Sequence, residues 1–137
     1  MLTKTKKLVD SNVLVYAYDA NSSFHERATA FLTDPSFDYY IATKNISEYF
    51  AVLSKIGEPF AKAWQFYVSA KSNCTILYPT PASLAIFENL MQKYQPKGNR
   101  TYDLEIVSIA LANQVTDIAT HNIKDFANIT EINVHPI

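Results

Sequence analysis

The chain has 137 residues, of which 48% are hydrophobic and 18% are charged, and its net charge at pH 7 is −1. This length and balance predict one domain over residues 1–137 with a sizeable core, and they exclude a disordered chain. A near-neutral chain is not expected to bind nucleic acid by bulk charge alone. It is compatible with a nuclease whose carboxylates lower the net charge until a divalent metal neutralises them.

No segment resembles a membrane span or a signal peptide. Lys4, Lys6 and Lys7 are followed by only Leu8 and Val9 before an acid, which is too short for the apolar core of a signal. The single cysteine cannot form an internal disulfide, in agreement with a reducing compartment. We therefore expect a cytoplasmic protein that does not enter a membrane.

The first half of the chain alternates short apolar runs with helical patterns. Residues 13–18 are apolar throughout and fit a strand or a short helix equally well. Thr43 is a suitable N-cap for the second helix, and Gly57 stands just past its end. The predicted elements are a strand at 8–9, a helix at 24–32 with Ser22 or Ser23 as its cap, a strand at 39–42 and a helix from Thr43 to Ile56.

The second half continues the alternation. We predict helices at 59–70, 81–91 and 103–115, a loop at 94–99, strands at 75–77 and 118–119, and an edge strand within 129–134. Strands that alternate with helices predict an α/β fold, a parallel sheet with helices on both faces. Right-handed crossovers then place the carboxyl ends of successive strands at one edge.

Acidic and polar residues follow these predicted strand ends. Asp10 follows the first strand, Glu48 lies in the helix after the second, Asp103 opens a helix, and Asn122 follows the strand at 118–119. Ligands of open α/β sheets bind at this edge, so the side chains are expected to converge. Oxygen ligands without a cysteine or a paired histidine favour Mg²⁺ or Mn²⁺ over zinc. Such an ion can activate water for attack on a phosphodiester.

Each of these residues also has a simpler interpretation. Asp10 fits a turn or an N-cap, Asp103 fits a helix cap, and Glu48 fits a surface glutamate paired with Lys44. Basic side chains near the same edge could hold an RNA phosphate or be ordinary surface charges; they are Lys44, Lys97, Arg100 and Lys124.

Together, these segments resemble the PIN-domain family, in particular the VapC-like toxins of toxin–antitoxin pairs. The resemblance spans nearly the whole chain. The matching pieces, in order, are Val9 to Ala17, His25 to Ala28, Asn45 to Tyr49, Tyr102-Asp103 before an apolar helix, and Ile118 to Phe126.

The resemblance implies a three-layer PIN-like domain, a central parallel sheet flanked by helices, with Mg²⁺- or Mn²⁺-dependent ribonuclease activity. Metal-ligand roles then fall to Asp10, Glu48 and Asp103, supported by Ser11 or Asn12 and by Thr120. Many members carry an acid where this chain has Asn122. An amide carries no charge, so Asp117 or Asp125 is the alternative fourth acid. The family also implies a homodimer and a small antitoxin that covers the cleft.

We therefore predict a metal-dependent endoribonuclease, the toxin of a type II toxin–antitoxin module. The main alternative is a non-catalytic PIN-like module that binds RNA or a protein. Asn122 supports this alternative, because an uncharged amide stands where many members of the family carry an acid. An aspartyl-phosphate phosphatase would also begin with an acid after the first strand. It normally needs a second aspartate two residues later, where this chain has Asn12.

Overall fold

A computed structural model describes residues 3–137. Its strands are β1 (Thr5–Val9), β2 (Phe37–Ala42), β3 (Cys74–Leu77), β4 (Asp117–Thr120) and β5 (Asn133–Pro136). Its α-helices are α1 (Ser11–Tyr18), α2 (His25–Leu32), α3 (Thr43–Lys55), α4 (Phe60–Lys71), α5 (Pro81–Tyr94) and α6 (Arg100–Ala112). A single 3₁₀ turn, η1 (Ile123–Asp125), follows β4.

The five strands form one parallel sheet in the order β3-β2-β1-β4-β5. The predicted parallel α/β fold is therefore confirmed. The strand β1 is central and pairs with β2 on one side and with β4 on the other. Because all strands run the same way, the carboxyl ends of β1, β2 and β4 lie at one edge, where α1, α3 and η1 begin.

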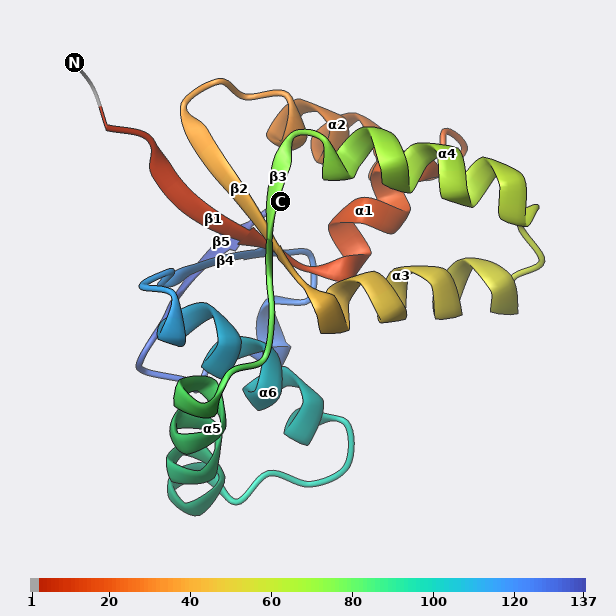
Figure 1. Ribbon diagram of the computed structural model, residues 1–137. Coiled ribbons are helices and arrows are strands. Elements are labelled where there is room, and N and C mark those ends of the chain that lie inside the picture. Colours follow the sequence, from red (N-terminus) through yellow and green to blue (C-terminus); the bar gives the residue numbers. More distant parts are fainter. Residues whose placement is uncertain (1–2) are drawn as a thin grey trace.

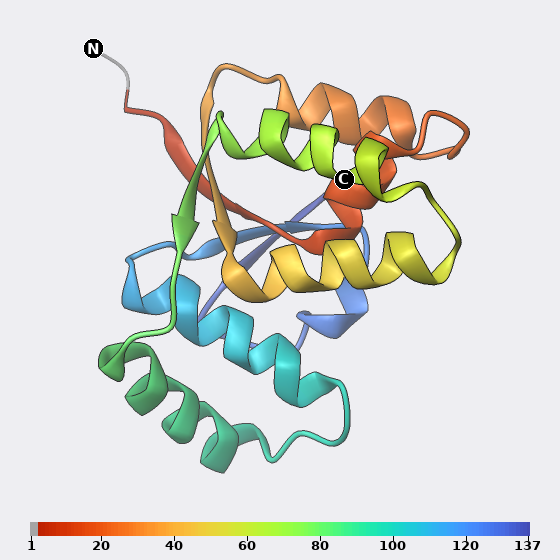
Figure 2. The ribbon, with the colours of Figure 1, turned by 45° about the vertical axis from the view of Figure 1, so that its right-hand side comes forward.

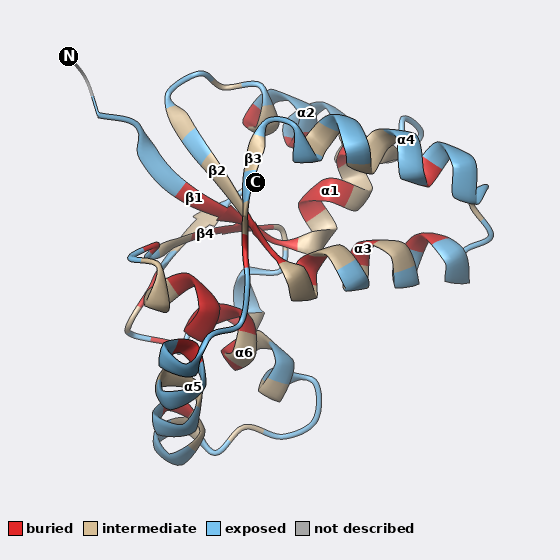
Figure 3. Ribbon diagram, in the orientation of Figure 1, coloured by how far each residue is buried: buried red, intermediate tan, exposed pale blue. Residues whose placement is uncertain are grey.

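Helices cover both faces of the sheet, as Figures 1 and 2 show, with α1 to α4 on one side and α5 and α6 on the other. Successive strand residues point to opposite faces. Leu8 and Ile118 pack with α5 and α6, whereas Val9 and Ala119 pack with α1 to α4. Buried residues concentrate at the centre of the sheet and along α6 (Figure 3). The molecule therefore has two apolar layers with the sheet between them.

The structure resolves the ambiguous segment after β1 as helix α1. It also extends β1 back to Thr5, where the sequence predicted a strand of two residues. Lys7 obscured this strand in the sequence. Its ammonium is buried and pairs with Asp117 at 3.0 Å, at the amino end of β4. A buried lysine is tolerated when an acid lies beside it, and this acid is 110 residues away in the chain.

Two predicted helix caps are wrong. Thr43 is the first residue of α3 and Ala42 is its N-cap, whose N–H donates to Asn45 Oδ1 at 3.1 Å. The N-cap of α2 is Phe24, without a side-chain cap, so neither Ser22 nor Ser23 fills that position. The Ser22 hydroxyl instead accepts the N–H of Phe24 at 3.1 Å, in the preceding turn.

Other boundaries moved by a few residues. Helix α6 begins at Arg100, three residues before the predicted start, and ends at Ala112 rather than Val115. The edge strand lies at Asn133–Pro136 instead of within 129–134. Helix α3 ends at Lys55, one residue before the predicted Ile56, and Gly57 follows its C-cap with φ of 84°, a conformation that glycine adopts without strain. No helix within residues 3–137 is long and apolar enough to cross a membrane.

Candidate active site

Asp10 is the N-cap of α1 and lies directly beyond the carboxyl end of β1. Its carboxylate is buried and accepts four hydrogen bonds. Oδ1 accepts from the Ser11 N–H at 2.9 Å and from Asn45 Nδ2 at 3.3 Å. Oδ2 accepts from Thr120 Oγ1 at 2.8 Å and from Asn12 Nδ2 at 3.0 Å. Asp10 is therefore a helix cap, as the simpler interpretation held, and also the centre of a polar network.

This network joins the ends of β1 and β4. The Thr120 hydroxyl donates to Asp10 and accepts from Asn12 Nδ2 and from the Asn122 N–H, both at 3.0 Å. The side-chain Oδ1 of Asn12 accepts the His121 N–H at 3.0 Å. Asn12 and Thr120 both contact Asp10 and hold its carboxylate in one orientation; their supporting role at a metal site stays a prediction. Burial nevertheless raises the pKa of Asp10, against the lowering effect of these donors.

Asn45 completes the network, although the sequence analysis gave it no role. It is fully buried in the first turn of α3 and connects the N–H of Ala42 to Asp10. Its amide therefore positions β2, α3 and Asp10 relative to one another. A signal was present in the sequence: Asn45 and Glu48 are three residues apart, which places them on one face of the helix.

Glu48 lies on α3 and is half-buried. Its Oε1 is fully buried without a hydrogen-bond partner among the described residues. The structure rejects a purely surface role for this side chain, because a solvated glutamate would keep both oxygens in water. Burial raises the pKa of Glu48, and the charge of Asp10 raises it further, while Lys44 opposes the shift. A buried carboxylate oxygen without a donor is costly unless a cation or a proton reaches it.

Asp103 lies in the first turn of α6, and its pKa is raised to about 7. Burial is the largest cause, followed by the charges of Asp125, Asp10 and Glu48. Arg100 acts in the opposite direction. Asp103 is not the cap of α6, since Asn99 occupies that position. Asp103 therefore lies within electrostatic reach of Asp125, Asp10 and Glu48.

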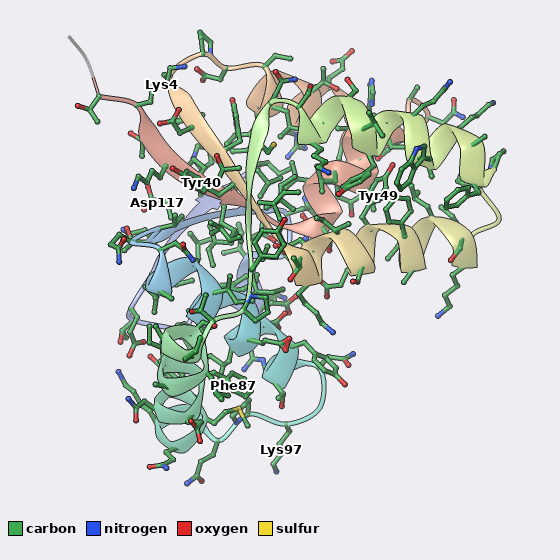
Figure 4. The ribbon with its side chains drawn as sticks, in the orientation of Figure 1. Lys4, Tyr40, Tyr49, Phe87, Lys97 and Asp117 are labelled. Atoms are coloured by element: carbon green, nitrogen blue, oxygen red, sulfur yellow. The ribbon has the colours of Figure 1, made fainter. Side chains whose placement is uncertain are left out.

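The two alternative fourth acids have different positions. Asp117 lies at the amino end of β4, where it binds Lys7 and accepts from Asn133 Nδ2 at 3.0 Å. Figure 4 shows it at the side of the sheet away from α1 and α3, so Asp117 as a ligand at this site is wrong. Asp125 belongs to the acidic group through its effect on Asp103 and Asp10. Asn122 is exposed at the start of η1, and its N–H donates to Thr120.

The basic residues are not equivalent either. Lys44 Nζ lies 4.2 Å from the centre of the Tyr102 ring, which links the first turns of α3 and α6. The Arg100 guanidinium donates to the backbone carbonyl of Lys124 at 3.0 Å, and its charge acts on Asp103. Lys97 lies on the loop between α5 and α6 and points away from the molecule (Figure 4). Lys44 and Arg100, whose charges act on Glu48 and Asp103, are therefore better placed than Lys97 to meet a phosphate.

The donor set suits a hard divalent cation such as Mg²⁺ or Mn²⁺. The site supplies several carboxylates that repel one another and one buried carboxylate oxygen without a donor. In their present conformations, however, no three Asp, Glu, His or Cys side chains of residues 3–137 are grouped so as to hold one ion. Direct coordination by three of these acids would require some of the carboxylates to rotate. Asp10 is fixed by its four donors, so Glu48 and Asp103 are the side chains that would adjust.

Comparison with known proteins assigns the family. The family model described as PIN domain matches residues 7–132, so the chain belongs to the PIN-domain family. No curated protein sequence is significantly similar to the chain.

Solved structures share the fold over nearly the whole chain. One is a chain from the VapBC2 complex of Rickettsia felis bound to a promoter DNA fragment, with a TM-score of 0.77 at 19% identity, covering 97% of this chain and 99% of that one. Another is VapC20 of Mycobacterium tuberculosis, described as a sarcin-ricin loop cleaving toxin, with a TM-score of 0.69 at 12% identity, covering 93% and 98%. A chain of the DNA-bound VapBC complex of Salmonella typhimurium has a TM-score of 0.69 at 18% identity, covering 96% and 98%.

Proposed function

We propose that the chain is a Mg²⁺- or Mn²⁺-dependent endoribonuclease that acts as the toxin of a toxin–antitoxin pair in the cytoplasm. The observation that carries this proposal is the acidic group at the carboxyl edge of the sheet, in which Glu48 has a buried oxygen without a donor and the pKa of Asp103 is raised to about 7. Perturbed carboxyl groups of this kind are typical of functional sites. Membership of the PIN-domain family, together with similarity to a toxin described as cleaving the sarcin-ricin loop, supports the reaction class.

In this proposal, Asp10, Glu48 and Asp103 hold the metal, with Asn122 or Asp125 in the fourth position. A bound divalent ion would lower the pKa of a water molecule and stabilise charge on the phosphate. The protein residues have separate roles. Thr120, Asn12 and Asn45 hold the Asp10 carboxylate in one orientation through the hydrogen bonds described above. Ser11 contributes its backbone N–H to the same carboxylate.

The cations would bind the RNA backbone. Arg100 lies beside Asp103 and is held by the backbone carbonyl of Lys124, and Lys44 is held over Tyr102. A phosphate that approaches the acids would otherwise meet uncompensated negative charge, so nearby guanidinium and ammonium groups are required to position it. Lys44 and Arg100 also lower the pKa values of Glu48 and Asp103, respectively, which favours the ionised, metal-binding forms.

The test is RNA cleavage by the Asp10→Asn variant. Asparagine keeps the size of the side chain but removes the charge, so cleavage should be abolished while the circular dichroism spectrum is unchanged. Asp38→Asn is a matched control, because Asp38 is exposed on β2 and lies outside the acidic group. Cleavage by Asp10→Asn at the wild-type rate would contradict the proposal.

A non-catalytic PIN-like module is the second candidate. The observation that favours it is that no three acidic side chains are grouped to hold an ion in the structure. Isothermal titration with Mn²⁺ distinguishes the two. Binding that Asp103→Asn weakens supports the nuclease, whereas no binding, or binding that Asp103→Asn leaves unchanged, supports the module.

We further propose a small antitoxin protein as the partner. The similar chains from Rickettsia felis and Salmonella typhimurium come from VapBC complexes, and a Klebsiella pneumoniae chain comes from a toxin–antitoxin complex. The outer sides of α3 and α4 expose several apolar side chains that a protein could cover, namely Val52, Ile56, Phe60, Trp64 and Val68. Light scattering on the purified chain would test the homodimer that the family resemblance implies.

A further inference from the structure

A pocket of about 180 Å³ lies next to the acidic group, between the end of α5, the start of α6 and the segment after η1. Apolar and polar side chains both line it. The apolar ones are Pro96, Leu104 and Ile129, and the polar ones include Arg100, Asp125 and Asn128. Tyr94 completes the wall. None of the hydrogen bonds to Asp10 involves these side chains, so the pocket lies beside the Asp10 network and adjoins the proposed metal site through Asp125.

The pocket and the acidic group are neighbours through two residues. Asp125 lines the pocket, and its charge is the largest electrostatic cause of the raised pKa of Asp103. Leu104, which forms another part of the wall, follows Asp103 in α6. A ligand in the pocket would therefore lie beside any phosphate held at the carboxylates.

The walls of the pocket are held in place. The Tyr94 hydroxyl accepts the N–H of Thr130 at 3.0 Å and donates to Glu131, which fixes the end of α5 against the C-terminal segment. The Arg100 guanidinium is held by the carbonyl of Lys124 at 3.0 Å. Leu104 and Ile129 belong to the buried core. The pocket is thus largely preformed, which reduces the entropic cost of binding.

We propose that this pocket receives one unpaired nucleobase of the RNA, next to the phosphate that is cut; the inference rests on the proposed function. Leu104, Ile129 and Pro96 offer an apolar surface to the faces of a base. Arg100, Asp125 and Asn128 offer donors and acceptors to its edge, as in other sites that read RNA bases. Pockets for drug-sized ligands measure about 300–1,000 Å³, so this smaller one suits a base rather than a whole nucleotide.

This assignment restricts the substrate. A base that is stacked and paired in a duplex cannot enter a pocket between two helices, whereas a base in a loop or single strand can turn outward. The target should therefore be unpaired next to the cut. Phe126 does not stack on this base, because it is not among the residues that line the pocket.

The test measures binding without chemistry. The full chain, labelled with ¹⁵N and kept in EDTA, is titrated with each of the four nucleoside 5′-monophosphates and, separately, with ribose 5-phosphate. We expect the nucleotides, but not ribose 5-phosphate, to shift the amide signals of Leu104 and Asn128. Asn128→Ala should weaken nucleotide binding several-fold. Asn73→Ala is the matched control, since Asn73 is also exposed but lies before β3, outside this pocket.

Four results would overturn the inference. Three are equal shifts with ribose 5-phosphate, no shifts at the pocket, and equal weakening by Asn128→Ala and Asn73→Ala. The fourth is that Asn128→Ala disrupts a protein complex but leaves nucleotide binding intact, which would assign the pocket to a protein side chain. The same experiments distinguish this inference from the proposed function. Nucleotide binding without RNA cleavage would support the base pocket and contradict the nuclease. RNA cleavage without nucleotide binding would support the nuclease and contradict the base pocket.

Discussion

At the scale of single residues, Thr120 has more polar contacts than its position in a buried strand suggests. Its hydroxyl donates to Asp10 and accepts from Asn12 and Asn122, and the residue is fully buried. Thr120→Val keeps the shape but removes these bonds, and leaving buried partners unsatisfied costs about 1–3 kcal/mol. We expect that loss in the free energy of unfolding, measured by urea denaturation.

Thr116→Val is the matched control for this prediction. Thr116 is exposed just before β4, so its substitution should change the free energy of unfolding by less than about 0.5 kcal/mol. Equal losses in the two variants would show that the Thr120 hydroxyl does not stabilise the site.

The raised pKa of Asp103 predicts how stability depends on pH in the absence of metal. Its pKa is about 7 in the folded protein and 3.8 as a model value, so the folded state holds the proton more tightly. Stability should therefore fall as the pH rises between these values, and the penalty should be complete above the folded pKa. Burial raises the pKa values of Asp10 and Glu48 in the same direction.

The measurement is urea denaturation in EDTA at about pH 5 and about pH 8, which bracket most of this interval. The wild type should be more stable at the lower pH. Asp103→Asn should reduce the difference, because the neutral amide does not titrate and still fills the same space. A difference as large in Asp103→Asn as in the wild type would assign the effect to other groups.

Sequence reasoning located some of these residues and missed others for a physical reason. Residues that follow parallel strands share an edge, so Asp10, after β1, and Glu48, in the helix after β2, could be grouped from order alone. Asp103 opens a helix that follows a loop, and its grouping with them depended on the family resemblance. The sequence could not identify Asn45 as a site residue, because other polar residues also stand at the start of that helix. Its burial depends on how α3 packs against Asp10. Choosing between Asp117 and Asp125 required the strand register, which places Asp117 beside Lys7.

At the scale of elements, α3 and α4 are joined by a buried hydrogen bond. The Tyr49 hydroxyl donates to the carbonyl of Ala63 at 2.8 Å, and Figure 4 shows Tyr49 between the two helices. Tyr49→Phe should lower the free energy of unfolding by about 1 kcal/mol or more, since the carbonyl loses its donor. Amide hydrogen exchange in Phe60–Lys71 should increase.

Tyr78→Phe provides the control, because Tyr78 is 61% exposed and follows β3. It should leave both the unfolding free energy and the exchange in α4 unchanged. An unchanged exchange rate in Tyr49→Phe would mean that apolar packing alone holds α4.

The elements themselves were predictable where periodicity was clear and less so elsewhere. Helix α3 is such a case: Tyr49 and Leu53 are four residues apart and both face the core. The segment 13–18 is apolar on all sides, so its period could not separate a helix from a strand, and the cap formed by Asp10 decided for a helix. The start of α6 was missed because Arg100 and Thr101 are polar residues without an apolar neighbour to mark the first turn.

At the scale of the whole molecule, metal binding should stabilise the fold. A ligand that binds only the folded state raises its stability by mass action. We therefore expect Mg²⁺ or Mn²⁺ to raise the melting temperature, and EDTA to reverse the change. The increase should be reduced in Asp103→Asn, which removes one predicted ligand. Calcium is a useful comparison, because its larger size favours more ligands than Mg²⁺ requires. A melting temperature that no divalent ion changes would contradict the metal site.

The hydrogen bond between Thr120 and Asp10 joins residues 110 positions apart, which has a consequence during protein synthesis. While the ribosome is still translating, β1 can pair with β2, but it lacks β4 and the Thr120 hydroxyl until the last part of the chain emerges. A nascent chain therefore has Asp10 without the partner that orients it. We expect ribosome-bound chains that end before residue 117 to lack the RNA-cleaving activity proposed for the folded protein.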